Sequence, residues 1–423
     1  MTRTARAGMA VLGVLALAAA GCGTGEGQGT SGSGSGPVSD SAGSAGSAGS
    51  AGKLSWDNEK VVAGRGELTD IAAVASDDVW VAGHDEKNGE TKADDQYLLH
   101  WDGRTWKRQA IPAPLGDSVF EVRLDVVGKD GVWIYGLDEQ GDTQRIARRD
   151  GDRWSAVPAP DLSNGRLTDT AAFAEDDVSV LLTSQGEGNG TVAHWDGTRW
   201  ISAHLPAHAD ALDGTSGTDL WAVGLRTSGS GVGGKGKEYG QPAAMHGNGL
   251  FWRLKDTPTY RFKDPVPPEP SASLTDVVAR SATDVTAYGS HTYDHGEVDN
   301  EPPPEEAIRL HWDGSAWHAL PERHKGCDAR SPLGEDGRNA TDGKGGVFLS
   351  GRRYSAADGS CAKIAWSPLP ARDGVTASAQ QSVWPAETAL VPGTDRVLAV
   401  GHVQVNQSGD PLSKPVLLEL KKQ

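Results

Sequence analysis

The chain has 423 residues and a formal net charge of −17, from 40 Lys and Arg against 57 Asp and Glu. An acidic surface of this kind repels nucleic-acid phosphates and anionic lipid headgroups, so we expect no nucleic-acid partner and no electrostatic attachment to membranes. The sequence holds 56 Gly, 23 Pro and 14 Trp, which favour short strands joined by turns, and it shows no helical periodicity.

The first residues form an export signal. Arg3 and Arg6 precede an apolar run of residues 9–20. This run is too short to span a bilayer, and its length is typical of a signal-peptide core.

The apolar run ends in Leu17-Ala-Ala-Ala-Gly-Cys22, which resembles the lipobox of bacterial lipoproteins, although Ala19 stands where that family most often has Leu. The resemblance implies that residues 1–21 are removed and that Cys22 carries diacylglycerol, a stable anchor. The protein would then be held at the outer face of the bacterial plasma membrane. A secretory peptide with an incidental cysteine is the alternative.

Residues 22–53 consist largely of Gly, Ser and Ala and lack the apolar content of a core. They predict a flexible tether with an end-to-end distance of about 30 Å. Residues 54–423 then form the folded domain.

A repeated unit with a period near 50 residues begins at residue 68. Its first copy predicts four strands, at residues 68–74, 79–83, 97–101 and 105–108. Asp102-Gly103, between the last two, favours a tight hairpin turn. Four short antiparallel strands per unit are typical of one blade of a β-propeller.

Seven copies are aligned by the residue that ends the second strand of each. These positions are Gly83, Gly136, Leu182, Gly224, Gly289, Gly351 and Gly401. In copy six, only Ala365-Trp366 remains of the outer strands. Copy seven lacks a fourth strand, and residues 54–62 have the character to supply it. We therefore expect an all-β, seven-bladed propeller of four-stranded antiparallel blades, closed as a ring by the N-terminal strand.

The two ends of the predicted blades differ in loop length. Tight turns, such as residues 76–78 and Asp102-Gly103, lie at one end, which we call the short-turn face. The connections between strands two and three and between blades lie at the other end, the long-loop face. This face carries every long insertion, at residues 85–96, 226–241, 256–271, 290–306, 322–338 and 403–415. Because binding residues concentrate on loops held by a rigid scaffold, we expect the ligand at the long-loop face.

Two further cysteines, Cys327 and Cys361, both fall on the long-loop face. Disulfides persist in exported proteins, so we expect a Cys327–Cys361 bond. Two free thiols are the alternative.

Charged residues recur at the start of the innermost strands. Asp70, Asp169 and Asp276 each follow Leu-Thr, and Arg123 and Arg338 occupy the same register in copies two and six. We expect all five at the mouth of the central channel. They could bind a cation or a polar ligand, but the preferred interpretation is that each Asp accepts backbone hydrogen bonds between blades.

No residues in the sequence suggest a catalytic or metal centre. His100, His194 and His311 belong to separate copies of the repeat, so we expect them to pack strands. The acidic loop of residues 85–95 lacks the spacing of a known calcium loop. We expect no metal, no cofactor and no catalytic residue.

The units Asp77-Asp-Val-Trp-Val-Ala-Gly83 and His100-Trp-Asp-Gly-Arg-Thr-Trp106 resemble those of exported propeller-repeat proteins common in actinobacteria. The resemblance concerns the scaffold and implies no catalytic residues. We expect a monomeric binding module that recognises a protein or a cell-envelope glycan through the long-loop face. The alternative is a carbohydrate-active hydrolase or lyase, which needs two carboxylates about 5–10 Å apart, one with a raised pKa.

Overall fold

The computed structural model describes residues 53–87, 91–92, 95–116, 118–138, 143–161, 165–183, 188–227, 239–260, 270–293, 306–320, 338–357 and 360–422. The chain divides into two units, Met1–Ser47 and Ala48–Gln423, and all described residues belong to the second. Within these residues no helix has both the length and the apolar character needed to cross a membrane. Cys22 and Cys327 lie outside the described residues, so the lipid anchor and the disulfide to Cys361 stay predictions.

The described unit contains 29 β-strands and one short 3-10 helix, η2 (Ala113–Leu115). The first three sheets each have four antiparallel strands in chain order. The first sheet consists of β2 (Gly66–Ala75), β3 (Asp78–Asp85), β4 (Gln96–Trp101) and β5 (Trp106–Gln109). The second consists of β6 (Phe120–Val127), β7 (Gly131–Leu137), β8 (Gln144–Asp150) and β9 (Arg153–Val157). The third consists of β10 (Arg166–Ala174), β11 (Asp177–Thr183), β12 (Thr191–Trp195) and β13 (Trp200–His204).

The remaining strands form three sheets of eight, four and five strands. The eight-stranded sheet holds β14 (His208–Ser216), β15 (Asp219–Thr227), β16 (Gly240–Gly247), β17 (Trp252–Lys255), β18 (Pro270–Ser281), β19 (Asp284–Tyr293), β20 (Glu306–Trp312) and β21 (Trp317–Ala319). The four-stranded sheet holds β22 (Ala340–Thr341), β23 (Val347–Leu349), β24 (Arg353–Ser355) and β25 (Cys361–Lys363). The five-stranded sheet holds β26 (Ala365–Trp366), β1 (Leu54–Val61), β29 (Leu412–Lys422), β28 (Val397–Asn406) and β27 (Gln380–Leu390).

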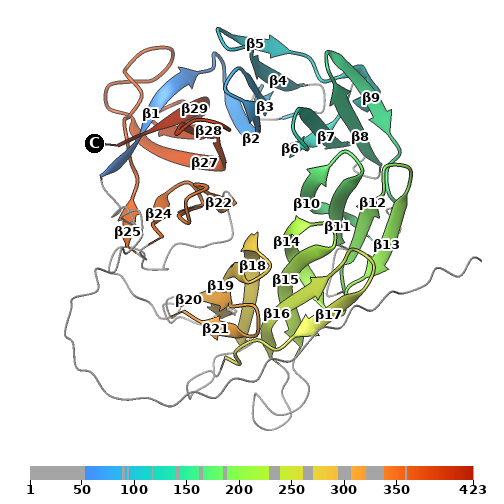
Figure 1. Cartoon of the computed structure of the whole chain (residues 1–423). Helices are drawn as coiled ribbons and strands as arrows, with labels where there is room; N and C mark the ends of the chain where they lie inside the picture. The colour runs from blue at the N-terminus through green and yellow to red at the C-terminus, as the bar shows by residue number, and fades with distance from the viewer. Residues whose placement is uncertain are drawn as a thin grey trace, which may run out of the picture. The chain divides into compact units, whose positions relative to one another are not determined.

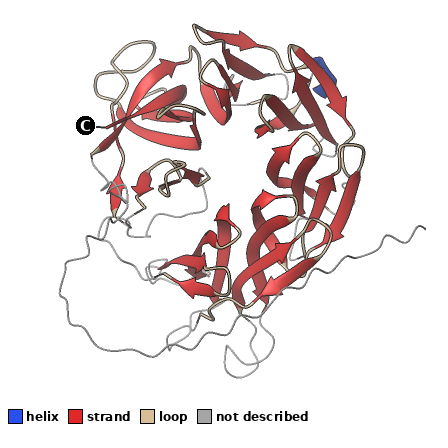
Figure 2. Cartoon of the chain, viewed as in Figure 1, coloured by secondary structure: helices blue, strands red, loops and turns tan. Residues whose placement is uncertain are grey.

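The sheets are arranged around a common axis with β2, β6, β10, β14, β18, β22 and β27 innermost (Figure 1). Almost all of the described secondary structure is strand (Figure 2). The unit is therefore an all-β propeller of four-stranded antiparallel blades, as the repeat predicted. Its core consists of separate clusters between neighbouring sheets, such as the one that joins Leu68 on β2 to Val400 on β28.

The prediction of seven separate four-stranded sheets is wrong. Five sheets have the four or five strands of a single blade, and the sixth has eight strands. A parallel pairing of Gly240 on β16 with Ser271 on β18 joins the eight strands into one sheet. The repeat could not reveal this link, because it is formed where two units meet and not within either of them.

The N-terminal strand pairs with the last strand of the chain. β1 pairs antiparallel with β29, with Leu54 opposite Lys422 and Val61 opposite Val416. Ala365-Trp366, expected among the outer strands of copy six, instead forms β26 and pairs in parallel with β1. β24 and β25 complete the four-stranded sheet of that copy, after β22 and β23.

The predicted Asp-Gly hairpins are confirmed. Trp101 pairs with Trp106 across the first of them, and the same pairing recurs at Trp195–Trp200 and Trp312–Trp317. The glycine of each turn has a positive φ, 82° at Gly103, which an L side chain rarely adopts. The recurring motif is therefore architectural.

The repeated histidines have the structural role that the sequence predicted. His100 Nε2 lies 2.8 Å from Asp78 Oδ1, and the His100 ring stacks on Trp80 at 4.0 Å. His311–Asp284 repeats the contact in the eight-stranded sheet, as does His246–Asp219, and His194 Nδ1 lies 3.2 Å from Ser179 Oγ. Each pair connects the second and third strands of its own blade, so these histidines do not converge.

Candidate functional site

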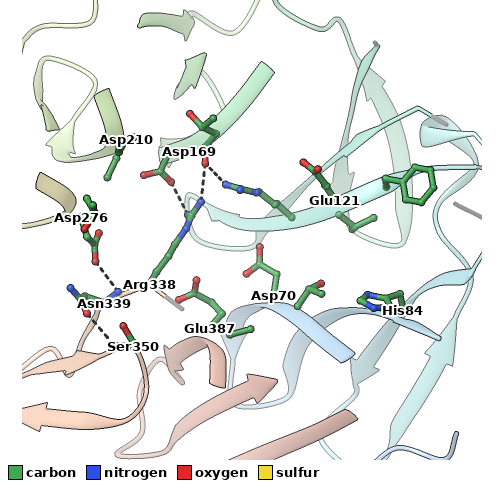
Figure 3. Close-up of a pocket in the computed structure, with 18 of the residues that line it drawn as sticks. Asp70, His84, Glu121, Asp169, Asp210, Asp276, Arg338, Asn339, Ser350 and Glu387 are labelled. Carbon is green, nitrogen blue, oxygen red and sulfur yellow. Dashed lines mark hydrogen bonds and ion pairs between the residues drawn. The ribbon is translucent and has the colours of Figure 1, made fainter. Parts of the chain in front are cut away.

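A cavity of about 680 Å³ lies where the innermost strands surround the axis. Thr91, from the long connection between β3 and β4, and Gln96, the first residue of β4, line it together with residues at the starts of β6 and β14, so it borders the long-loop face. All five residues predicted at the channel mouth line this cavity: Asp70, Arg123, Asp169, Asp276 and Arg338 (Figure 3). A second, smaller cavity shares Asp70, Asp169, Asp276 and Arg338 and adds Asp125 and Asp213.

A β-bulge positions the aspartate of each Leu-Thr-Asp segment. In β2 and β18 the strand register shifts between the Leu and the Asp, so that Thr69 and Thr275 are the extra residues. The opposing strand comes very close there: a Cβ built on Gly289 would lie 1.9 Å from the Ser273 carbonyl oxygen. This close approach explains the glycine that ends the second strand of the repeat.

Each bulge aspartate joins two neighbouring sheets. Asp70 Oδ1 accepts a hydrogen bond from the N–H of Ile71 at 2.7 Å, and its Oδ2 accepts one from the N–H of Leu124, on β6, at 2.9 Å. Asp169 repeats the arrangement with Thr170 and Leu212. The structural interpretation of these aspartates is thereby confirmed.

Asp276 forms the same pair of bonds with Val277 and with Asn339, the residue before β22. Asp213 is a further member of this set that the sequence analysis missed. Its oxygens accept from Gly214 and from Ala279, on β18, each at 2.8 Å. It follows a Leu, as Asp125 does in copy two, but lies outside the Leu-Thr-Asp register.

Glu387 on β27 is another cavity carboxylate that the sequence analysis missed, as are Glu121 and Asp210. It follows the bulge of its strand, opposite Val400, just as Asp70 follows its bulge opposite Ala82. Asp70 lies thirteen residues before Gly83, whereas Glu387 lies fourteen before Gly401, because the turn between β27 and β28 is one residue longer. Allowing that one-residue gap would have found it.

Glu387 is bonded differently from the aspartates. Its Oε1 accepts the N–H of Thr388 at 3.1 Å, and no neighbouring blade donates to it among the described residues. In Figure 3 its carboxylate and that of Asp70 point into the cavity from adjacent strands. Glu387 therefore keeps one carboxylate oxygen available to a ligand.

Two arginines compensate part of this negative charge. Arg338 reaches from the segment before β22 to β10, where its Nη1 lies 2.8 Å from Asp169 Oδ1 and its Nη2 donates to the Thr168 carbonyl oxygen at 3.4 Å. Arg123, on β6, donates to the same carbonyl oxygen. Both cations thus reach β10, and the Arg338 side chain lies between Asp276 on one side and Glu387 and Asp70 on the other (Figure 3).

Burial controls proton affinity in the cavity. It raises the pKa of Glu387 to about 8, and the charge of Asp70 adds to the shift. Burial likewise raises the pKa of Asp276 and of Asp213 to about 7, and that of Asp125 to about 6. Burial by itself would lower the pKa of Arg338. The negative charges of Asp169, Glu387 and Asp70 have a larger effect, so the pKa of Arg338 is raised.

Three further features of the cavity lining favour contact with a ligand. The buried hydroxyl oxygens of Thr69 and Thr275 have no hydrogen-bond partner among the described residues. Glu121 and Ser350, which also line the cavity, hold positive φ angles of 51° and 46°. Non-glycine residues adopt this conformation at a cost, and such positions cluster at functional sites.

Within the described part of the chain, no three His, Cys, Asp or Glu side chains are grouped so that they could hold a metal ion. The bulge aspartates direct their oxygens at backbone N–H groups and not at a common point. The arrangement suits hydrogen bonding and charge pairing with a polar ligand.

No protein-family model matches the sequence, and no curated protein matches it. The chain is similar to several solved structures. "YCF48 bound to D1 peptide" aligns at 11% identity and a TM-score of 0.44, over 87% of this chain and 95% of that one. A polysaccharide lyase aligns at 9% identity and 0.43, over 82% and 88%.

A GH74 xyloglucanase from Xanthomonas campestris aligns at 15% identity and a TM-score of 0.40, over 82% of this chain and 54% of that one. Structural similarity at these values identifies neither a ligand nor a reaction for this protein. The class of this protein, a β-propeller with a charged central cavity, therefore follows from its own strands and side chains.

Proposed function

We propose that this protein is a membrane-anchored, extracytoplasmic binding module that receives a protein or a cell-envelope glycan at its long-loop face. The observation that carries the proposal is the cavity of about 680 Å³ on that face, which is lined by several carboxylates and two arginines. A rigid ring that presents a polar cavity among long loops is a common form of binding site. Cys22 would supply the anchor and residues 23–53 the tether.

The bonding of the aspartates favours binding over catalysis. A catalytic carboxylate must offer an oxygen to the substrate. Each of Asp70, Asp169 and Asp276 instead uses one oxygen to accept the N–H of the next residue and the other to accept an N–H of the neighbouring blade. Alkylating these groups would weaken the ring itself.

A carbohydrate-active hydrolase or lyase is the second candidate, and Glu387 is the reason for retaining it. Its pKa of about 8 suits a general acid or base near neutral pH, and one of its oxygens is not committed to the backbone of a neighbouring blade. A partner carboxylate with an uncommitted oxygen would still be needed.

The number of blades and the closure of the ring are also proposed. We infer that the eight-stranded sheet acts as two blades, β14–β17 and β18–β21, which gives seven units, and that β1 closes the ring by pairing with β29. A Cys327–Cys361 disulfide, a monomeric state and the absence of a cofactor complete the prediction. Intact mass before and after reduction tests the disulfide.

Crosslinking in intact cells tests the binding proposal. A photo-activated side chain at Thr91, an exposed residue that lines the cavity, is compared with one at Arg104, exposed on the short-turn face. We expect a discrete adduct from position 91 that is absent from position 104 and reduced by E387Q. Identical adducts from both positions, or none from position 91, would contradict the proposal.

Turnover measurements distinguish the second candidate. Purified protein is incubated with a panel of cell-envelope and plant polysaccharides, and released reducing or unsaturated ends are measured. Turnover that E387Q abolishes would replace the binding proposal with the enzymatic one.

A further inference from the structure

The β16–β17 hairpin carries an apolar tip on the short-turn face. Four large hydrophobic side chains are exposed in the described residues, and three belong to this hairpin: Leu250 at 45%, Phe251 at 75% and Leu254 at 41% exposure. The position of Phe251 in the repeat is held by Thr105, Arg153, Arg199 and Ala316 in other copies. The apolar tip is therefore particular to one blade.

The tip is held in a defined conformation. Asn248 Oδ1 accepts the N–H groups of Leu250 and Phe251 at 3.2 and 2.9 Å, as Asp196 Oδ1 does in the neighbouring blade. A Cβ built on Gly249 would lie 3.0 Å from the carbonyl oxygen of Gly217, in the β14–β15 turn, which places the tip among the short turns. Phe251 thus projects from a fixed hairpin.

The described chain begins on the same face. Leu54 pairs with Lys422, the last residue of β29. β29 enters from the long connection after Asn406, on the long-loop face, so its C-terminal end lies at the short-turn face. Lys53, the first described residue, is therefore at the short-turn face, where it and Lys422 are exposed.

We propose that the short-turn face rests on the phospholipid bilayer, with Leu250 and Phe251 inserted at the boundary between headgroups and acyl chains. This inference rests on the proposed lipid anchor at Cys22. Two apolar side chains bind a bilayer weakly by themselves. A tether of about 30 residues holds the tip at an effective concentration on the order of millimolar, at which weak insertion suffices.

This orientation has a consequence for the cavity. The strands run between the two faces, so a propeller resting on its short turns directs the long-loop face and the cavity mouth away from the membrane. The exposed Arg253, beside Leu254 on β17, would lie near the headgroups and offset part of the acidic repulsion. The anchor and the tip together would orient the binding site outward.

Lipid quenching of a fluorophore tests the proposal on the full-length lipidated protein in phosphatidylcholine–phosphatidylglycerol vesicles. An environment-sensitive dye is attached through R199C, the equivalent turn position in the neighbouring blade, and nitroxide-labelled lipids serve as quenchers. We expect quenching at R199C that F251S lowers about tenfold, in line with the loss of one inserted aromatic side chain. A dye at T91C, on the opposite face, should stay unquenched.

The matched control is A316S, the same kind of change at the equivalent turn of another blade, which should leave quenching at R199C unchanged. F251S should melt as the parent protein does, because Phe251 is largely exposed. Equal quenching with and without F251S, or equal quenching at R199C and T91C, would overturn the proposal.

Membrane fractionation of C22S separates this proposal from the anchor. If C22S still fractionates with membranes, or the native chain carries no acyl group, the anchor proposal fails. If C22S is released but F251S leaves the quenching unchanged, the anchor stands and only the docking of the short-turn face fails.

Discussion

The aspartates of the short turns and the aspartates of the cavity accept similar hydrogen bonds in opposite surroundings. Asp196 Oδ1 accepts the N–H groups of Thr198 and Arg199 at 2.9 Å each, and the oxygens of Asp276 accept those of Val277 and Asn339 at 2.8 and 2.9 Å. The Thr198 hydroxyl and these N–H groups lower the pKa of Asp196, whereas burial raises the pKa of Asp276 to about 7.

The difference shows which role each set plays. At the turns, the bonded residues are two or three positions apart, so the carboxylate fixes a local conformation that water surrounds. In the cavity, each aspartate joins its own strand to the next sheet, and burial makes its charge costly. The turn aspartates shape hairpins, and the cavity aspartates hold the blades together.

Removing a cavity aspartate should have the largest effect. D276A leaves the N–H groups of Val277 and Asn339 without their acceptor, on two neighbouring sheets. We expect the free energy of unfolding to fall by about 3 kcal/mol, the cost of two buried unsatisfied donors. Urea unfolding followed by tryptophan fluorescence measures it. An unchanged midpoint would show that the blades are held by apolar packing alone.

Removing the cavity cation should cost somewhat less. R338M takes away the partner of Asp169 and the charge that faces Asp70 and Glu387. We expect a loss of about 2 kcal/mol, below the 3–5 kcal/mol of a fully buried pair, because the Arg338 side chain keeps 39% exposure. R104M, on an exposed turn, is the control and should unfold as the native chain does.

The cavity carboxyls and the turn aspartates predict opposite pH dependences of the free energy of unfolding. The raised pKa values of Glu387, Asp276, Asp213 and Asp125 mean that the folded state keeps protons which the unfolded chain releases near pH 4. Their contribution to stability is complete below about pH 4 and is lost as the pH rises toward 8. The lowered pKa of Asp196 has the reverse effect, since its contribution is lost only below about pH 4.

Stability should therefore be highest near pH 4–5 and several kcal/mol lower at pH 8, measured by urea unfolding at fixed ionic strength. E387Q, which cannot ionise, should flatten the decline between pH 5 and 8. A stability that increases from pH 5 to pH 8 in the native chain would contradict the effect of burial on these carboxyls.

The smallest effect is expected at the turn. D196A removes two hydrogen bonds, as D276A does, but water can replace the acceptor at this exposed site. Its thermal midpoint should fall clearly less than that of D276A, measured in parallel by calorimetry. Equal decreases would mean that the turn and the cavity aspartates contribute alike.

Much of the fold could be predicted from residues close together in the sequence. The Trp-Asp-Gly-x-x-Trp spacing predicted the hairpins, and the repeat of four strands predicted the propeller class. Both rest on contacts within one unit. The number of separate sheets was predicted wrongly because the Gly240–Ser271 link joins two units across a variable loop.

The cavity residues were predicted only in part, where they recur at a fixed position within one unit. The Leu-Thr-Asp register identified Asp70, Asp169 and Asp276, and strict spacing added Arg123 and Arg338, all of which line the cavity. Glu387 was missed because one extra turn residue shifts its spacing. Asp213 was missed because its bond to β18 depends on the neighbouring sheet.

The sequence by itself determined the hairpins, the repeated four-stranded unit and the contrast between short turns and long loops, because these depend on backbone preferences and on neighbours a few residues away. Only the tertiary structure decided the chemistry of the cavity. Arg338 meets Asp169 from a segment 169 positions away in the chain, and Asp70 meets Leu124 on another sheet. Burial then sets the charge of these groups, and burial exists only once the innermost strands surround the axis.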